Sequence, residues 1–155
     1  MKILNDFVVA SDSGKLSFVV LLDLSAAFDM VDHVILFNRL AKNFGIRGTA
    51  LSWLISFLSD RSICVSVKSC FSYEADIIHG VPQGSVLGPL LFSLFVSPVT
   101  DIVQSYGLQC HTYADDVAIY FSCYPRDICS FLDTLRSCLN HVYDWFSSNL
   151  SLIHI

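Results

Sequence analysis

The residues best suited to chemistry are the adjacent acids of the stretch Tyr113-Ala114-Asp115-Asp116. Two carboxylates side by side repel each other unless a cation neutralises them. The flanking segments 108–112 and 117–121 are rich in strand-forming residues, which predicts that the acids lie at or near the turn of a β-hairpin. A turn would hold both carboxylates at the rim of a sheet, where Mg²⁺ can reach them.

A third carboxylate, Asp23, lies far away in sequence and ends a separate apolar run. Three acids at one rim would form a divalent-metal site for nucleotide chemistry, because Mg²⁺ prefers hard oxygen ligands. The competing interpretation is that Asp115 and Asp116 belong to an ordinary polar turn, where aspartate is common. What separates the two interpretations is whether Asp23 meets the hairpin.

The elements that must position these acids follow from hydrophobic patterning. Residues 18–22 form an unbroken apolar run rather than an alternating one, which predicts a central strand covered on both faces. Asp32 is placed to cap a helix over residues 33–44, with Gly45 as its stop. A second helix is predicted over residues 48–58.

The second half of the chain predicts a hairpin of two strands, 61–67 and 71–78, and two further helices. Pro89 is tolerated only in a first helical turn, so the next helix begins at about residue 86 or 88 and runs to 104. The last helix is predicted over residues 125–146, where apolar residues recur at i, i+3 and i+4. This order predicts an α+β fold, a small and mainly antiparallel sheet with helices packed on one face.

The composition is that of one domain, or a piece of one, with 155 residues and a hydrophobic fraction of 54%. The charge-free run 77–100 has the length of a membrane span, but its prolines and glycines favour a loop followed by a buried helix, with no membrane involved. The N-terminus lacks the apolar block of a secretory signal, which predicts an intracellular chain, in the nucleus or the cytoplasm. The six cysteines have no metal-ligand spacing and are expected to be buried free thiols.

The net charge of −5 is awkward for a protein that binds nucleic acid, because phosphate contacts need lysine and arginine. Two bound Mg²⁺ ions would offset four of the five negative charges. Only nine basic residues are present, and they form no basic run. A complete polymerase would therefore need a positively charged groove from elsewhere.

Three blocks in one order resemble the palm of a reverse transcriptase: LDLSAAFD at 22–29, GVPQGSVLGPLLF at 80–92 and YADD at 113–116. The residues that follow Pro-Gln-Gly, together with Val31-Asp32-His33, are most similar to those of non-LTR (LINE-type) retrotransposons. The resemblance covers about residues 12–149. It implies an RNA-directed DNA polymerase, with an RNA template, a DNA primer and deoxynucleoside triphosphates as partners.

The resemblance also implies roles for the acids and for the residue that follows the first of them. Asp23 and Asp115 would bridge two Mg²⁺ ions, or Mn²⁺ in their place, and Asp116 would support the metal on the primer side. The backbone carbonyl of Leu24 would add a ligand. Such a pair of metals suits the in-line transfer of a nucleotide to a primer 3′-hydroxyl.

Other residues of the three blocks are expected to contact the nucleotide or the primer. Phe28 matches the family's aromatic gate, which would clash with a ribose 2′-hydroxyl; the alternative is a plain core aromatic. Gln83 and Gly84 would face the incoming nucleotide and template where a loop enters a helix. Tyr113 would line the primer side or simply pack. Asp29 is expected to brace its turn rather than bind metal.

Compared with the family, the chain is expected to be a partial reverse transcriptase domain over residues 1–155, a palm with a little of the fingers. The fingers are then incomplete and the thumb missing, so little or no activity is expected of the chain alone. Two alternatives stay open. One is a non-catalytic, retroelement-derived fragment or binding protein, which the negative charge favours; the other is an RNA-directed RNA polymerase palm, which Phe28 opposes.

Overall fold

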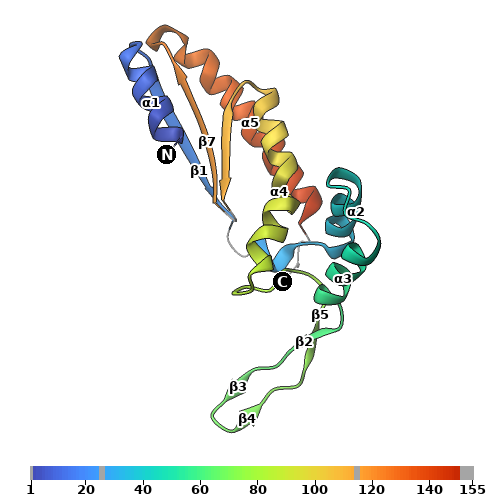
Figure 1. Cartoon of the computed structure of the whole chain (residues 1–155). Helices are drawn as coiled ribbons and strands as arrows, with labels where there is room; N and C mark the ends of the chain where they lie inside the picture. The colour runs from blue at the N-terminus through green and yellow to red at the C-terminus, as the bar shows by residue number, and fades with distance from the viewer. Residues whose placement is uncertain (1, 25–26, 114–115, 151–155) are drawn as a thin grey trace. The chain divides into compact units, whose positions relative to one another are not determined.

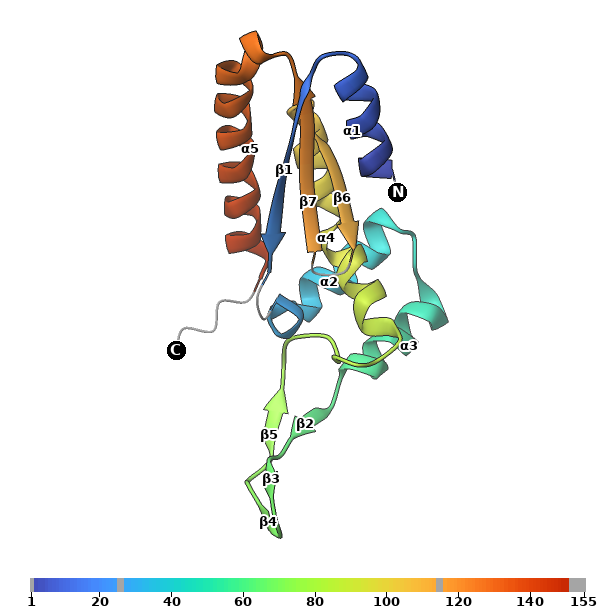
Figure 2. The same cartoon turned by 90° about the vertical axis from the view of Figure 1, so that its left-hand side faces the viewer.

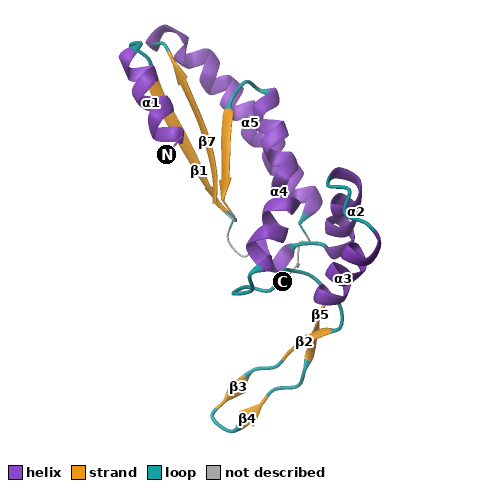
Figure 3. Ribbon diagram, viewed as in Figure 1, coloured by secondary structure: helices purple, strands orange, loops and turns teal. Residues whose placement is uncertain are grey.

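The computed structural model describes residues 2–24, 27–113 and 116–150 of the chain (Figure 1). Five helices and seven short strands are present in these ranges, coloured by type in Figure 3. The helices are α1 (Lys2–Asp12), α2 (His33–Asn43), α3 (Gly48–Leu58), α4 (Leu87–Ser105) and α5 (Ile128–Asn149), with 3₁₀ turns at Ala27–Met30 and Pro125–Asp127. The strands are β1 (Leu16–Asp23), β2 (Arg61–Ile63), β3 (Ser66–Val67), β4 (Cys70–Phe71), β5 (Ala75–Ile77), β6 (Gln109–Tyr113) and β7 (Asp116–Cys123). The predicted α+β class is confirmed.

The chain divides into two compact units. The first comprises Met1–Ser25 and Val96–Ser148, and the second comprises Ala26–Phe95 and Asn149–Ile155. The three-stranded sheet, with order β1-β7-β6 and antiparallel pairing throughout, belongs to the first unit (Figure 2). The hairpin of the second unit pairs β2 with β5 and β3 with β4, as the sequence predicts, with a break between the two pairs.

The core of the first unit lies between one face of this sheet and the helices α4 and α5. Every second residue of β7 faces it, and Phe121 of that strand stacks on Phe18 of β1 at 5.1 Å and on Phe131 of α5 at 5.3 Å between ring centroids. The buried cluster consists of Val99, Val103, Leu108, Val117, Ile119, Phe121, Cys123, Cys138 and Val142. Burial of these side chains is the main driving force for closing this layer.

The opposite face of the sheet carries α1, a helix that the sequence analysis missed. Tyr120 of β7 points to this face, where its ring meets Phe7 edge-on at 5.8 Å and its hydroxyl donates to the Asp6 carboxylate at 3.0 Å. In Figure 1 α1 and α5 lie on opposite sides of the sheet. The prediction of helices on one face only is therefore wrong, because Ile3, Phe7 and Ala10 give α1 an apolar side of its own.

The prediction that β1 is a central strand covered on both faces is also wrong. In the described sheet β7 is central and β1 is at the edge. Residues 18, 20 and 22 are half-buried, whereas Val19 and Leu21 are 47% and 75% exposed. An unbroken apolar run suggests two covered faces, but here one face of the strand stays open.

The helices of the second unit begin and end largely where the sequence predicts. The Asp32 carboxylate accepts a hydrogen bond from the Ile35 N–H at 2.9 Å and caps α2, and Gly45 follows the helix with φ of 67°. At the start of α4, the Ser85 hydroxyl accepts from the Gly88 N–H at 2.9 Å and donates to the Pro82 carbonyl at 2.8 Å. At each helix start a side chain thus accepts from one backbone N–H of the first turn.

In the part of the chain that the structure describes, α4 alone is long and apolar enough to cross a membrane by length and composition. Its buried apolar side chains are those of Leu91, Phe92, Phe95, Val96, Val99 and Val103, as in a core helix. The cysteines are all free, but only Cys123 and Cys138 are buried, so the expectation of six buried thiols is wrong for Cys64, Cys70 and Cys129, which are exposed. Burial raises the pKa of the half-buried Cys110 thiol.

Tyr120→Phe is expected to lower the free energy of unfolding by about 1 kcal/mol, because the half-buried Asp6 carboxylate loses its donor. Burial, and then the bond to Asp6, raises the pKa of Tyr120. The contribution of the hydroxyl is therefore fully present below about pH 10, the ordinary tyrosine pKa, and is lost as the pH rises through the higher folded-state value. Urea unfolding of both proteins between pH 7 and 11 measures this difference. Tyr113→Phe, at an exposed tyrosine, should leave the stability unchanged.

Candidate active site

The candidate site begins with a row of three residues across the sheet of the first unit. Asp23 of β1 is the direct partner of Asp116 of β7, and Asp116 is in turn the partner of Tyr113 of β6. Residues directly opposite each other in a ladder project to the same face, with Cβ atoms about 4.5–5.5 Å apart. We call Asp23, Asp116 and Tyr113 the aspartate row. All three are exposed, Tyr113 by 77%.

The aspartate row lies on the face of the sheet that α1 only partly covers. Strand alternation puts Asp116 on the same face as Tyr120, which contacts α1 two rows further along. Between them lies a row formed by Leu21, Ala118 and His111, of which Leu21 and His111 are exposed. The two carboxylates therefore lie at the solvent-exposed end of this face, whereas α1 covers the other end.

Two carboxylates directly opposite each other destabilise a sheet unless a cation neutralises them. Their oxygens are the hard donors that Mg²⁺ prefers, and both side chains are open to solvent, which leaves room for the waters that Mg²⁺ keeps. The donor set therefore fits a divalent metal. Asp115, predicted to bridge the two metals together with Asp23, lies outside the described residues. Within the described ranges, no group of three acid, histidine or cysteine side chains is close enough to hold a metal ion.

Leu24, predicted to contribute its backbone carbonyl, lies at the end of β1, where its side chain packs against the core cluster of the first unit. This packing fixes the strand end directly after Asp23. It is consistent with an outward-facing Asp23 next to an inward-facing neighbour, as strand alternation requires.

The remaining predicted residues belong to the second unit. Phe28 lies in the 3₁₀ turn and is half-buried, and its ring stacks on Phe92 of α4, with 4.6 Å between ring centroids and 12° between planes. Gln83 and Gly84 lie in the exposed loop before α4, where Gly84 has a φ of 79°. The Gln83 amide donates to both carboxylate oxygens of Asp29, at 3.2 and 3.3 Å, so Asp29 braces the turn as expected.

The loop and the turn meet at Gly80 with almost no space between their backbones. A Cβ on Gly80 would lie 2.9 Å from the Cα and carbonyl oxygen of Asp29 and 3.0 Å from the Phe28 carbonyl oxygen. The next residue, Val81, donates its N–H to that Phe28 carbonyl at 2.8 Å. The structure therefore brings Phe28, Asp29 and Gln83 together in this unit.

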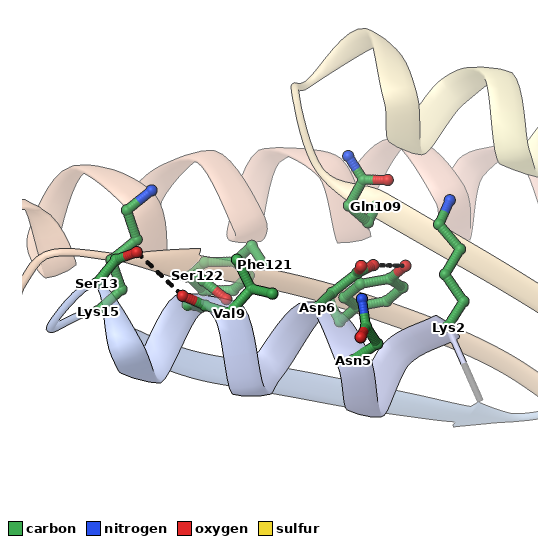
Figure 4. A pocket seen from close by; sticks show the side chains of 11 residues that line it. Lys2, Asn5, Asp6, Val9, Ser13, Lys15, Gln109, Phe121 and Ser122 are labelled. Carbon is green, nitrogen blue, oxygen red and sulfur yellow. Dashed lines mark hydrogen bonds between the residues drawn. The ribbon is translucent and has the colours of Figure 1, made fainter.

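A pocket that the sequence analysis missed, lined by both polar and apolar side chains, lies between α1 and the sheet (Figure 4). It encloses about 590 Å³, with Lys2 and Lys15 among its lining side chains, as well as Asn5 and Gln109. Lys15 also lies over the ring of Tyr124, 5.3 Å from its centroid. The apolar spacing of α1 was the signal that could have found this helix, and with it the pocket.

The comparison with known proteins agrees with the sequence blocks. The family described as Reverse transcriptase (RNA-dependent DNA polymerase) matches residues 2–152. The chain therefore belongs to the reverse transcriptase family. Within that family its relatives are the polymerases of non-LTR, LINE-type retrotransposons, which confirms the resemblance drawn from the three blocks.

Three of these relatives are curated insect proteins. The probable RNA-directed DNA polymerase from transposon BS of Drosophila melanogaster is 35% identical over 73% of this chain and 13% of its own length. The RNA-directed DNA polymerase from mobile element jockey of the same species is 36% identical over 76% of the chain and 13% of its own length. Its counterpart from Drosophila funebris is 32% identical over 93% of the chain and 16% of its own length. The matched segment thus spans less than a fifth of these relatives.

Gly80→Ala is expected to lower the melting temperature, because the added Cβ meets backbone atoms of Asp29 at 2.9 Å and the residue has a φ of 86°. The matched control is Gly84→Ala in the same loop, where φ is 79° but no atom lies within 4 Å of the new Cβ. A left-handed non-glycine residue costs about 1–3 kcal/mol, and Gly80→Ala should exceed the control by the cost of the clash. Equal melting temperatures for the two variants would contradict the close approach.

Proposed function

We propose that this chain is the palm of an RNA-directed DNA polymerase from a LINE-type retrotransposon, which adds deoxynucleotides to a primer 3′-hydroxyl on an RNA template. The observation that carries the proposal is the pairing of Asp23 with Asp116 across β1 and β7. Family membership supports the reaction class, because the relatives are RNA-directed DNA polymerases by name. An ordinary polar turn at residues 115 and 116 would not account for a further carboxylate, Asp23, directly opposite Asp116.

In this proposal Asp23, Asp115 and Asp116 hold two Mg²⁺ ions, or Mn²⁺ in their place. The bound ions would supply charge neutralisation at the attacking and leaving oxygens of an in-line displacement. The protein's own part is to hold rigid carboxylates. Asp23 and Asp116 sit on paired strands, and Leu24 anchors the end of β1 in the core while its carbonyl serves as a further ligand. Tyr113, the third member of the row, lines the primer side.

The residues of the second unit would select and orient the nucleotide. Phe28 would exclude a ribose 2′-hydroxyl by steric contact with the sugar, and the stack on Phe92 keeps its ring from turning away. Gly84 offers a backbone without a Cβ for close approach, and Gln83 offers an amide that Asp29 already orients. Because a wrong rotamer of Phe28 or Gln83 would misplace the reacting atoms, the fixed geometry of these two side chains contributes to catalysis by orientation.

The net charge of −5 sets a limit on what the chain does unaided. Nucleic acid is held mainly by basic side chains on phosphates, and nine lysines and arginines in an acidic chain are few for a duplex. We therefore expect weak binding of primer-template and little or no polymerisation by the 155-residue chain alone. The same charge favours the second candidate function, a non-catalytic binding protein derived from a retroelement.

Removing one carboxylate of the row is expected to weaken metal binding. Loss of an outer-shell partner typically costs 10- to 100-fold in metal affinity, so Asp116→Asn, which removes a proposed direct ligand, should cost at least about tenfold for Mn²⁺. Titration of the 155-residue chain with Mn²⁺, followed by the electron paramagnetic resonance of the free ion, measures this. Asp101→Asn, at an exposed aspartate of α4, is the matched control. Equal affinities in wild type, Asp116→Asn and Asp23→Asn would refute the metal assignment.

Replacing Phe28 by valine is expected to raise ribonucleotide incorporation relative to deoxynucleotide incorporation. Relief of a steric contact of this size is worth about 10- to 200-fold in kcat/KM. The assay joins the chain to the fingers and thumb segments of a jockey-type polymerase and measures incorporation of dNTPs and rNTPs on an RNA template. Phe71→Val, at an exposed phenylalanine of the hairpin, is the matched control, and Asp115→Asn should abolish incorporation of both. A wild type that prefers ribonucleotides would instead favour an RNA-directed RNA polymerase.

A further inference from the structure

The segment Val31-Asp32-His33 joins the turn that bears Phe28 to helix α2. None of its three residues has a role in the proposed reaction. Both backbone groups of Gly80 are nevertheless bonded to this segment. The Gly80 N–H donates to the Val31 carbonyl at 2.8 Å, and the Gly80 carbonyl lies 2.7 Å from Nε2 of His33. The second of these contacts joins positions 47 residues apart in the sequence.

The direction of the His33 bond follows from chemistry. A carbonyl oxygen can only accept, so Nε2 of His33 must carry the proton and donate. A donor remains at Nε2 in this neutral tautomer and in the imidazolium alike, because protonation occurs at Nδ1. Gly80 is buried, so its carbonyl has no easy access to water if the imidazole is removed.

His33 is fixed both at its ring and at the backbone that precedes it. Its ring lies 6.0 Å from the ring of Phe37, one turn further along α2. Its neighbour Asp32 caps the first turn of that helix through the Ile35 N–H and forms an isolated antiparallel bridge with His79. His33 is therefore a fixed donor at the start of a helix rather than a mobile surface side chain.

On the other side of residues 79–81 lies the turn with the proposed sugar gate. Val81 donates to the Phe28 carbonyl at 2.8 Å, and Gly80 packs against the Asp29 backbone with no space for a Cβ. Two residues beyond, Gln83 donates to the Asp29 carboxylate. The backbone at Gly80 is thus clamped between the Phe28 turn and the start of α2.

We propose that His33 is a positioning residue, which through the Gly80 carbonyl holds the Gln83-Gly84 loop against the Phe28 turn so that both select the nucleotide as one rigid piece. His33 does not touch the nucleotide in this proposal. The hydrogen bonds of Gly80 described above support the attachment of the Gln83-Gly84 loop. Its effect on nucleotide selection rests on the proposed function.

The first test follows the loop itself in the 155-residue chain by amide hydrogen exchange. His33→Phe keeps an aromatic ring beside Phe37 but removes the donor. Loss of one hydrogen bond of ordinary strength corresponds to roughly a threefold to tenfold change in an opening equilibrium, so exchange at Gly80 and Val81 should accelerate by that factor. His33→Gln carries an amide nitrogen at the same number of bonds from Cβ and should restore protection in part.

The control for this test is His141→Phe, at an exposed histidine of α5, which should leave exchange at Gly80 and Val81 unchanged. A ¹⁵N spectrum of the histidine rings adds a direct readout, because the proposal requires a protonated Nε2 on His33. Unchanged exchange in His33→Phe, or a His33 ring with its proton on Nδ1 alone, would overturn the proposal whatever the polymerase assay shows.

The second test measures nucleotide selection in the assembly with fingers and thumb segments. His33→Phe should reduce the preference for dNTPs over rNTPs, mainly through KM for the nucleotide, and His33→Gln should recover it in part. A purely structural loss would lower kcat for both nucleotides equally, and that result would overturn the role in selection. If the wild-type assembly incorporates no nucleotide at all, the proposed function fails, and the exchange experiment still decides whether His33 fastens the loop.

Discussion

The register between β1 and β7 is the constraint on which the candidate site depends. A slip of one residue in an antiparallel pair turns every side chain of one strand to the other face. Such a slip would move Asp116 toward the core and would break the stack of Phe18 on Phe121 and the 2.8 Å hydrogen bond between the Ser17 and Ser122 hydroxyls. The apolar face therefore fixes the register, and the opposite face places the two acids. Core packing and site geometry are two consequences of one alignment.

The second unit fixes its candidate site residues in another way, since they lie in turns and loops rather than on paired strands. Loops that carry function need a rigid support. Here the support is backbone to backbone: Gly80 and Val81 bond to Val31 and Phe28, and glycine at position 80 permits an approach that no other residue would. Half-buried Arg39 adds to the same unit, donating to the Phe95 carbonyl and, at 2.8 Å, to the Asn149 side chain. Its pKa is lowered by burial, yet guanidinium remains charged and its donors remain paired.

How much of this could be predicted from the sequence depends on whether the signal was local. The cap at Asp32, the stop at Gly45 and the start of α4 near Pro89 are set by neighbours in the chain, and all three were predicted. Strand order is set by distant segments, so the apolar run of β1 was misplaced at the centre of the sheet.

Side-chain contacts between distant segments could not be predicted from local sequence patterns either. Nothing in the local pattern of Val31-Asp32-His33 or of Gly80 indicates that they bond to each other, because such contacts are set by the tertiary fold. The meeting of Asp23 and Asp116 at one rim was predicted from the strand-like runs beside each acid and from the family resemblance, but their direct pairing across two strands was not. The helix α1 differs from these cases, because its signal is local but short: one apolar side formed by Ile3, Phe7 and Ala10.

The charge of the open face explains why metal, template and protein must act together in the proposed reaction. The face presents two opposed carboxylates beside an exposed leucine and tyrosine, so alone it repels a phosphate strand and offers it apolar contacts. In the proposed reaction, two divalent ions would bring four positive charges against a net charge of −5 and would convert the same rim into one that attracts phosphate. Affinity for nucleic acid at this face would then be conditional on the metals, and it would decrease with salt as any phosphate contact does. The acids that make the isolated face repulsive would thus be the ones that make it selective for a metal-bound nucleotide.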